Sequence, residues 1–307
     1  MVNMISTDLQ NQLKQFVPAE NIKLQEPMSG HTSFRTGGGA DVFVLAENGE
    51  QLSGLIPYLH ERDYPFFLLG FGSNLLVSDD GYHGIMIKLS GELADIRVEG
   101  EHLIAGAAAP LAKAARVAYE HGLTGLEFAS GIPGSVGGGI VMNAGAYDGE
   151  MCQIVEWVKV MDTDGTIRQL DLEQMEFGYR TSIVKRQPLI VLETSFRLKQ
   201  GQKEQIGAYM EELAVRRRQK QPLEYPSAGS TFKRPDGYFA GKLIMDAGLR
   251  GYQIGGAQVS EKHCGFVINK GQATSTQVYQ LIEHVRAQVR EQFDVELEPE
   301  VILLGEF

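Results

Sequence analysis

Two glycine-rich segments contain the residues best suited to hold a ligand. The first, GFGSN, spans 70–74 and lies between two apolar runs. Glycine lets main-chain N–H groups approach a ligand closely, and together with the Ser73 hydroxyl these groups could surround a phosphate. The same pattern also fits an ordinary turn between two strands, because glycine and asparagine are common turn residues. Taken alone, this segment leaves both interpretations open.

The second segment is longer and more informative. Residues 125–139 read GLEFASGIPGSVGGG, and MNAGAY follows at 142–147. Each glycine in a regular element costs roughly 0.5–1 kcal/mol, so a purely structural role explains such a run poorly. Isoleucine, valine, methionine and phenylalanine are interleaved without a repeat, which argues against a flexible linker. The segment therefore indicates main-chain contact with a large flat or phosphorylated ligand.

Several other kinds of site are not predicted. The chain has no Gly-x-x-x-x-Gly-Lys-Ser/Thr motif, and the turn at 70–72 lacks the third glycine of a dinucleotide-binding Rossmann turn. Its two cysteines, Cys152 and Cys264, have no CxxC partner, and the seven histidines form no metal-binding spacing. We therefore expect no metal site.

Short elements must position the glycine segments. Strands are expected at 41–46, 66–70, 85–89, 102–106, 154–161, 166–170, 187–198 and 295–304, the last interrupted by Pro299. Helices are expected at 50–63 and 107–121, and apolar stripes predict two more, one through Ile206 and Leu213 and one through Val278 and Val289. An Asp-Gly tip at 164–165 favours a hairpin. The order lacks a regular βαβ rhythm, so we predict an α+β fold.

Composition limits the protein's surroundings. The net charge of −11 argues against nucleic-acid binding, and no apolar run approaches the roughly 18 to 20 residues that span a bilayer. The N-terminus lacks the pattern of a secretory signal, and the two cysteines encode no disulfide framework, so we expect a cytoplasmic protein.

A chain of 307 residues is long for one core, and the polar residues 199–202 are the expected boundary of a C-terminal domain. Oligomeric state is not predicted.

Motifs along nearly the whole chain resemble one enzyme family. They are HTSFRTGGGADVF at 31–43, GFGSNLLVSD at 70–79, the glycine run from 125, GYRTSIVK at 178–185, PSAGSTFKRP at 226–235, AGKLIMDAGLRG at 240–251 and LEPEVILLG at 297–305. Their order is similar to that of the UDP-N-acetylenolpyruvoylglucosamine reductase (MurB) family. Lacking an inserted loop between 185 and 225, the chain resembles the shorter, type II form.

The resemblance implies a fold and a reaction. It implies an FAD-binding fold of the vanillyl-alcohol-oxidase type, with subdomains at 1–90 and 91–200, followed by a substrate-binding α+β domain at 201–307. The family uses NADPH and FAD to reduce UDP-N-acetylglucosamine enolpyruvate to UDP-N-acetylmuramate, a peptidoglycan precursor needed for cell shape and division. By the same resemblance, Ser230 is the proton donor, Arg180 stabilises the enolate and Glu300 is the catalytic acid. Spacing alone does not distinguish Glu300 from Glu298.

The resemblance and the glycine pattern together give the remaining site residues. The expected FAD contacts are Gly70, Gly72, Ser73, Asn74, Leu75, Gly131, Pro133, Gly134, Ser135, Gly138, Asn143, Ala144 and Gly145. The expected substrate contacts are Tyr179, Lys220, Lys233 and Arg234.

Two alternatives remain open at this stage. One is another flavin oxidase or dehydrogenase with the same FAD-binding fold, which would need neither Ser230 nor Glu300. The other is a protein that binds a flavin or nucleotide sugar without catalysis. One scaffold can host many reactions, so the fold alone does not separate them.

Overall fold

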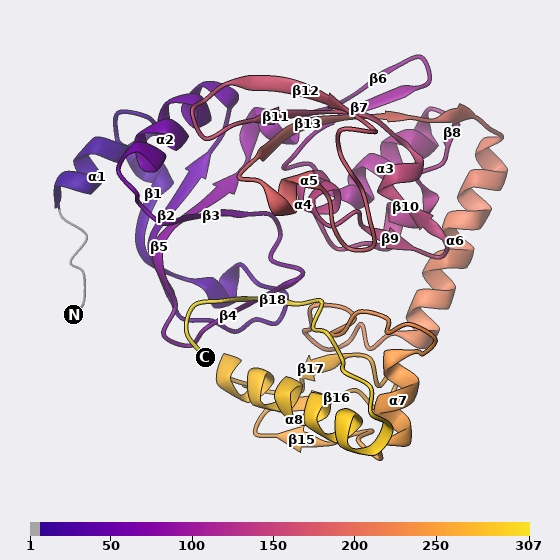
Figure 1. Ribbon diagram of the computed structural model, residues 1–307. Helices are drawn as coiled ribbons and strands as arrows, with labels where there is room; N and C mark the ends of the chain where they lie inside the picture. Colours follow the sequence, from indigo (N-terminus) through magenta and orange to yellow (C-terminus); the bar gives the residue numbers. More distant parts are fainter. Residues whose placement is uncertain (1–6) are drawn as a thin grey trace. The chain divides into compact units, whose positions relative to one another are not determined.

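The computed structural model describes residues 7–307, and helices and strands follow one another in the mixed order expected of an α+β protein (Figure 1). The described chain divides into two compact units. The first contains 7–24, 42–70 and 84–216, and the second contains 25–41, 71–83 and 217–307. Each unit thus combines stretches that are far apart in the sequence. The division into 1–90, 91–200 and 201–307 concerns function and stays a prediction.

Two sheets form the core of the first unit. The four-stranded sheet has the order β1-β2-β5-β3, and β3 and β5 are parallel. The five-stranded sheet has the order β12-β11-β13-β7-β6 and is antiparallel throughout. The strands are β1 (Ile22–Pro27), β2 (Gly39–Ala46), β3 (Phe66–Leu69), β5 (Tyr82–Leu89), β6 (Ile96–Glu99), β7 (His102–Gly106), β11 (Val155–Met161), β12 (Ile167–Asp171) and β13 (Ile190–Arg197).

Helices complete this unit. They are α1 (Thr7–Leu13), α2 (Gly49–Glu61), α3 (Leu111–Glu120), α4 (Val136–Val141), α5 (Ile183–Arg186) and most of α6 (Lys203–Lys220). The unit also contains two short strand pairs, which are β8 (Leu123–Thr124) with β14 (Lys199–Gln200) and β9 (Gly145–Ala146) with β10 (Gly149–Glu150). Leu52, Leu55 and Leu59 of α2 pack against Val42 and Val44 of β2. In Figure 1, α3, α4 and α5 lie on one face of the five-stranded sheet.

The second unit packs helices on a small sheet. Strands β15 (Gln253–Ile254), β16 (Ala257–Val259) and β17 (Val267–Asn269) are antiparallel, and α7 (Ala240–Asp246) and α8 (Ser275–Phe293) bury their apolar faces with them. Strand β4 (Leu75–Val77) pairs in parallel with β18 (Ile302–Leu304), more than 200 positions later. The 3-10 turns of the two units are Ala19–Asn21, Met28–Gly30, Gly91–Ala94, Glu127–Gly131 and Met151–Gln153.

Most predicted elements are confirmed, although many of their boundaries shift by a few residues and two are clearly wrong. Helix α3 begins at Leu111 rather than 107, because Pro110 occupies the N-cap position with an extended backbone. The expected strand 295–304 is reduced to Ile302–Leu304. The hairpin at Asp164-Gly165 is confirmed, since Gly165 has a φ of +87° and β11 and β12 pair on either side of it.

Candidate cofactor and active site

The turn at 70–74 presents free main-chain donors. Within residues 7–307, none of the five N–H groups from Gly70 to Asn74 donates a hydrogen bond. A side chain at Gly72 is excluded, because its φ is +60° and a Cβ atom would lie 2.1 Å from the His31 carbonyl oxygen. Buried or half-buried main-chain donors normally find partners, so this array fits the phosphates of a dinucleotide. The turn is therefore compatible with the FAD contact predicted for Gly70, Gly72, Ser73 and Asn74.

The second glycine segment is bound tightly to its own unit. The Leu111 N–H donates to the Gly134 oxygen at 2.9 Å, and the Val136 N–H donates to the Ala109 oxygen at 2.8 Å. The Ser135 hydroxyl caps α4 by accepting from the Gly138 N–H at 3.2 Å. A Cβ atom at Gly70 would lie 2.7 Å from the Ser135 hydroxyl oxygen, so the two predicted cofactor segments meet at this point.

Asn143 makes several contacts inside the protein. Its side-chain amide donates to the Glu150 carboxylate and to the Gly178 carbonyl, both at 3.1 Å, and its oxygen accepts from the Cys152 N–H at 2.9 Å. Only 1% of the residue is exposed, and its φ is +42°. These bonds connect the loop after α4 with the turn that carries Arg180. Its predicted cofactor contact stays a prediction.

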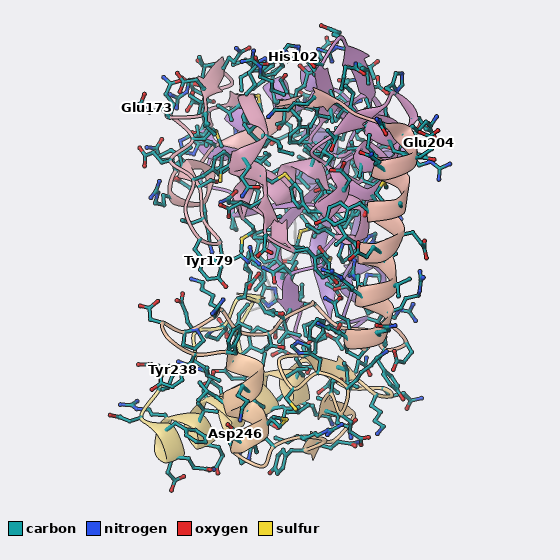
Figure 2. All side chains as sticks on the ribbon, turned by 90° about the vertical axis from the view of Figure 1, so that its right-hand side faces the viewer. His102, Glu173, Tyr179, Glu204, Tyr238 and Asp246 are labelled. Atoms are coloured by element: carbon teal, nitrogen blue, oxygen red, sulfur yellow. The ribbon has the colours of Figure 1, made fainter. Side chains whose placement is uncertain are left out.

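Arg180 is fixed by the same arrangement. Its guanidinium donates to the Gly145 carbonyl at 3.3 Å and lies over the Tyr179 ring at 5.1 Å. Its φ of +57° is left-handed, a conformation that costs a non-glycine residue about 1–3 kcal/mol and is concentrated at functional sites. Tyr179 is 53% exposed, with its side chain at the surface in Figure 2. A ligand therefore has access to the Tyr179 ring beside a constrained arginine.

The second unit brings Ser230 and Glu300 onto paired segments. The Glu300 N–H donates to the Thr231 main-chain oxygen at 2.8 Å, and the Lys233 N–H donates to the Glu298 main-chain oxygen at 2.9 Å. Phe232 and Pro299 form an antiparallel bridge between these bonds. Ser230 is exposed at the end of this pairing. A hydroxyl and a carboxyl group are thus placed on two segments that lie side by side.

The predicted substrate cations differ in their partners. The Lys233 ammonium forms an ion pair with the Glu298 carboxylate. The Arg234 guanidinium lies over the Phe239 ring at 4.0 Å and donates to the Tyr238 oxygen at 3.3 Å. Lys220 ends α6. Of the two neighbouring glutamates, Glu298 therefore forms an ion pair with Lys233. The choice of Glu300 as the acid stays a prediction.

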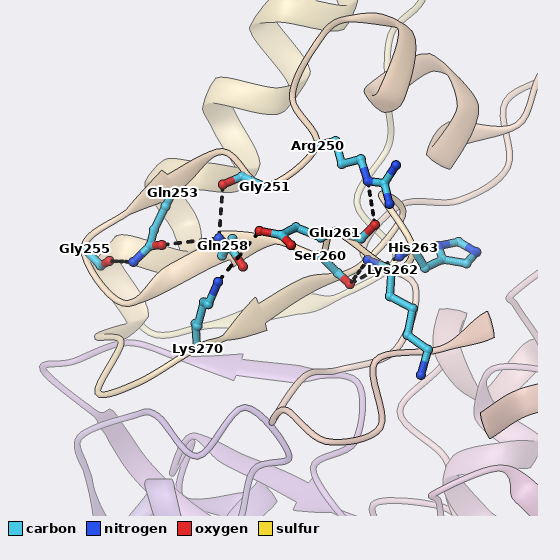
Figure 3. Close-up of polar contacts among 10 residues, drawn as sticks. All are labelled: Arg250, Gly251, Gln253, Gly255, Gln258, Ser260, Glu261, Lys262, His263 and Lys270. Carbon is cyan, nitrogen blue, oxygen red and sulfur yellow. Dashed lines mark hydrogen bonds and ion pairs between the residues drawn. The ribbon is translucent and has the colours of Figure 1, made fainter. Parts of the chain in front are cut away.

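The segment 250–263 was not given a role by the sequence patterns (Figure 3). The Gln258 side-chain amide donates to the Gly251 carbonyl oxygen at 3.1 Å, and the Arg250 side chain donates to the main-chain carbonyl oxygen of Glu261 at 2.7 Å. The Ser260 hydroxyl oxygen accepts the His263 N–H at 3.3 Å and holds the turn that carries this histidine. Burial lowers the pKa of His263, and the positive charge of Lys220 lowers it further. A neutral ring that accepts from the Gly265 N–H at 3.1 Å agrees with a structural role.

Known proteins resemble this chain over almost its full length. A reductase from Caldanaerobacter subterraneus, named UDP-N-acetylenolpyruvoylglucosamine reductase, is 53% identical over 97% of this chain and 98% of its own. A reductase of the same name from Lachnoclostridium phytofermentans is 49% identical over 96% of both chains. The chain belongs to the UDP-N-acetylenolpyruvoylglucosamine reductase family. The crystal structure of the MurB reductase from Thermus caldophilus agrees with this, with a TM-score of 0.80 and 35% identity over 92% of this chain and 98% of that one.

Two family models match separate parts of the chain. The FAD binding domain matches 40–171, which includes both glycine segments and Asn143. The C-terminal domain of UDP-N-acetylenolpyruvoylglucosamine reductase matches 221–304, which includes Ser230 and Glu300. The predicted family, the α+β fold and the FAD cofactor are therefore confirmed. The roles of individual residues stay predictions.

Between residues 7 and 307, no helix is long and apolar enough to cross a membrane. Over the same residues, no group of three or more histidine, cysteine, aspartate or glutamate side chains could hold a metal ion.

Proposed function

We propose that this chain reduces UDP-N-acetylglucosamine enolpyruvate to UDP-N-acetylmuramate, with bound FAD and with NADPH as the source of the hydride. Family membership across almost the whole chain supports the reaction. The observation that carries the proposal is the pairing of 230–233 with 298–300, which places a hydroxyl and a carboxyl group on adjoining segments. The reaction would take place in the cytoplasm and supply peptidoglycan synthesis.

Each reacting residue has a defined task. When bound, FAD supplies hydride chemistry between NADPH and the enolpyruvyl double bond. Arg180 stabilises negative charge on the substrate carboxylate and enol, for which a planar guanidinium with paired donors is suited. Ser230 delivers a proton to C2, and because a hydroxyl is a weak acid it needs cations nearby. Glu300 acts as the acid that polarises the enol.

Residues around these groups would hold the substrate. Lys220, Lys233 and Arg234 are proposed to meet the diphosphate and carboxylate, and Tyr179 to pack against the substrate. The free N–H groups of 70–74 and the segment 131–145 are proposed to hold the FAD. Since NADPH and substrate both exchange hydride with one flavin, they must react in turn, which gives ping-pong kinetics.

The test separates the two half-reactions. NADPH is added to the purified protein without oxygen, the flavin spectrum is recorded, and UDP-N-acetylglucosamine enolpyruvate is then added. We expect bleaching, followed by return of the oxidised spectrum. A protein that stays bleached is another flavin oxidase or dehydrogenase, and a protein that takes up no FAD contradicts the proposal.

A further inference from the structure

Asn74 makes a direct contact with the main chain of Glu300. Its side-chain amide donates to the Glu300 carbonyl oxygen at 3.0 Å, although 226 positions separate the two residues. In the other direction, the Ile302 N–H donates to the main-chain carbonyl oxygen of Asn74 at 3.0 Å. From here the pairing continues as the parallel ladder of β4 and β18, with Leu75 opposite Ile302. Asn74 therefore holds the segment that carries Glu300 by both its side chain and its main chain.

The opposite side of Glu300 is held by Thr231. The Glu300 N–H donates to the Thr231 oxygen at 2.8 Å, and the Thr231 N–H donates to the Gly265 oxygen at 2.8 Å. The Thr231 hydroxyl accepts from the Val267 N–H at 2.9 Å, and the residue is fully buried. The N–H of Glu300 is thus tied to a buried frame next to Ser230. Its carbonyl group is tied to Asn74.

We propose that Asn74 is a positioning residue for Glu300, an inference that rests on the proposed function. An acid must lie within a fraction of an ångström of its productive position, and a shift of about 1 Å can cost on the order of a hundredfold in rate. The Asn74 amide supplies a donor that an alanine does not, and the turn at 70–74 places it. The turn that presents free N–H groups would therefore also fix the proposed acid.

This role differs from the cofactor contact predicted for Asn74 from the sequence. An FAD contact would affect cofactor affinity and both half-reactions. A positioning contact would affect only the half-reaction in which Glu300 takes part, which is reoxidation of the flavin by the enolpyruvyl substrate. The two roles can therefore be separated with one protein and two substrates.

The experiment compares Asn74→Ala, Glu300→Gln and the double variant with the wild type. For each FAD-loaded protein, FAD affinity, the rate of bleaching by NADPH and the rate of reoxidation by UDP-N-acetylglucosamine enolpyruvate are measured. Asn21→Ala is the matched control, because its amide also donates to a main-chain oxygen, that of Leu45 at 3.3 Å, but in the other unit. The control should keep all three values.

We expect Asn74→Ala to slow reoxidation about ten- to a hundredfold. FAD affinity and bleaching should stay within about threefold of the wild type, and the double variant should be little slower than Glu300→Gln, because residues that act as a unit are not additive. If Asn74→Ala does not fold, Asn74→Ser is compared in the same way. Because serine retains a hydrogen-bond donor, this variant should slow reoxidation less than the ten- to a hundredfold expected for alanine.

Three results would overturn the proposal. In the first, Asn74→Ala loses FAD affinity or slows both half-reactions equally. In the second, the effects of the two single variants multiply in the double variant. In the third, Asn74→Ala is reoxidised at the normal rate. If Glu300→Gln itself reoxidises normally, the role proposed for Glu300 fails first, and Asn74 has nothing to position. Wild-type protein that is never reoxidised would instead contradict the proposed function.

Discussion

Left-handed backbone marks the residues around Arg180. Arg180 and Asn143 have φ angles of +57° and +42°, and neither residue is a glycine. Such conformations persist only where the surroundings impose them, at about 1–3 kcal/mol each. The bond from the Asn143 amide to the Gly178 oxygen is part of what imposes them. The strain agrees with the proposed role, since a guanidinium held in advance loses little freedom when it meets an anion.

Replacing Ser230 by alanine tests the proposed proton donor. We expect Ser230→Ala to slow reoxidation of the flavin by at least about a hundredfold, the range typical of a lost general acid, and to leave bleaching by NADPH unchanged. Stopped-flow absorbance measures both rates. Ser227→Ala is the matched control from the same segment and should behave as the wild type. Normal reoxidation by Ser230→Ala would remove the hydroxyl from the mechanism.

Cys152 should be a slow thiol. Burial, together with the hydrogen bond and charge of Glu150, raises the pKa of Cys152 to about 11. At pH 8 its thiolate is then on the order of a hundredfold scarcer than that of an ordinary cysteine, and alkylation should be slower in proportion. Mass spectrometry of iodoacetamide-treated protein measures the rate. Glu150→Gln should accelerate it, and an unchanged rate in that variant would show that burial alone is responsible.

At the scale of elements, helix α8 begins with its first donors satisfied. The Asp79 carboxylate accepts from the N–H groups of Ser275 and Thr276 at 2.7 and 2.8 Å. Thr274 then caps the third donor, that of Gln277, at 3.2 Å. Burial alone would raise the pKa of Asp79, but the hydrogen bonds from Thr276 and Ser275 outweigh it and lower the pKa. The carboxylate therefore stabilises the start of this helix.

Asp79→Asn should weaken this cap by about 1 kcal/mol at neutral pH. Because the pKa is lower in the folded than in the unfolded protein, the stabilisation is complete above the unfolded value of about 3.9 and is lost as pH falls through the folded value. The difference between wild type and variant in urea midpoint should therefore be constant near neutrality and shrink below about pH 4. Asp80→Asn, at the exposed neighbouring position, is the control. A gap that does not depend on pH would contradict the assignment.

The sequence predicted elements whose signals are local. Helix α8 and the hairpin of β11 and β12 follow from periodicity and from an Asp-Gly turn. The strand expected from 295 was wrong before Ile302, because that stretch pairs through a few isolated bonds and contains Pro299. Motifs led to Ser230 and Glu300, and to Asn74 as a predicted cofactor contact. They did not predict that Asn74 and Thr231 hold Glu300 through contacts between distant positions. No local pattern encodes such a contact.

At the scale of the whole molecule, the second unit shows why boundaries are hard to predict. It joins 25–41 and 71–83 to the C-terminal residues 217–307. Buried bonds make this connection, including that from the Asn269 amide to the Phe34 oxygen at 3.0 Å and that between the Ser275 and Thr36 hydroxyls at 2.9 Å. Composition along the chain can indicate only boundaries between segments that are neighbours in the sequence. Pairings across more than 200 residues require the three-dimensional structure.

The net charge of this protein should not be the source of its affinity for FAD. A net charge of −11 repels an anionic dinucleotide at long range, so its affinity must come from local donors such as the N–H groups of 70–74. FAD at about one hundred times its Kd should stabilise the folded protein by about 2.7 kcal/mol and raise the thermal midpoint by several degrees. Added salt should not reduce this shift, since it screens the repulsion. Differential scanning fluorimetry of the apoprotein, with FMN as the control lacking the adenylate half, measures the effect. An equal shift with FMN, or a shift that salt abolishes, would show that the glycine turn does not hold the dinucleotide.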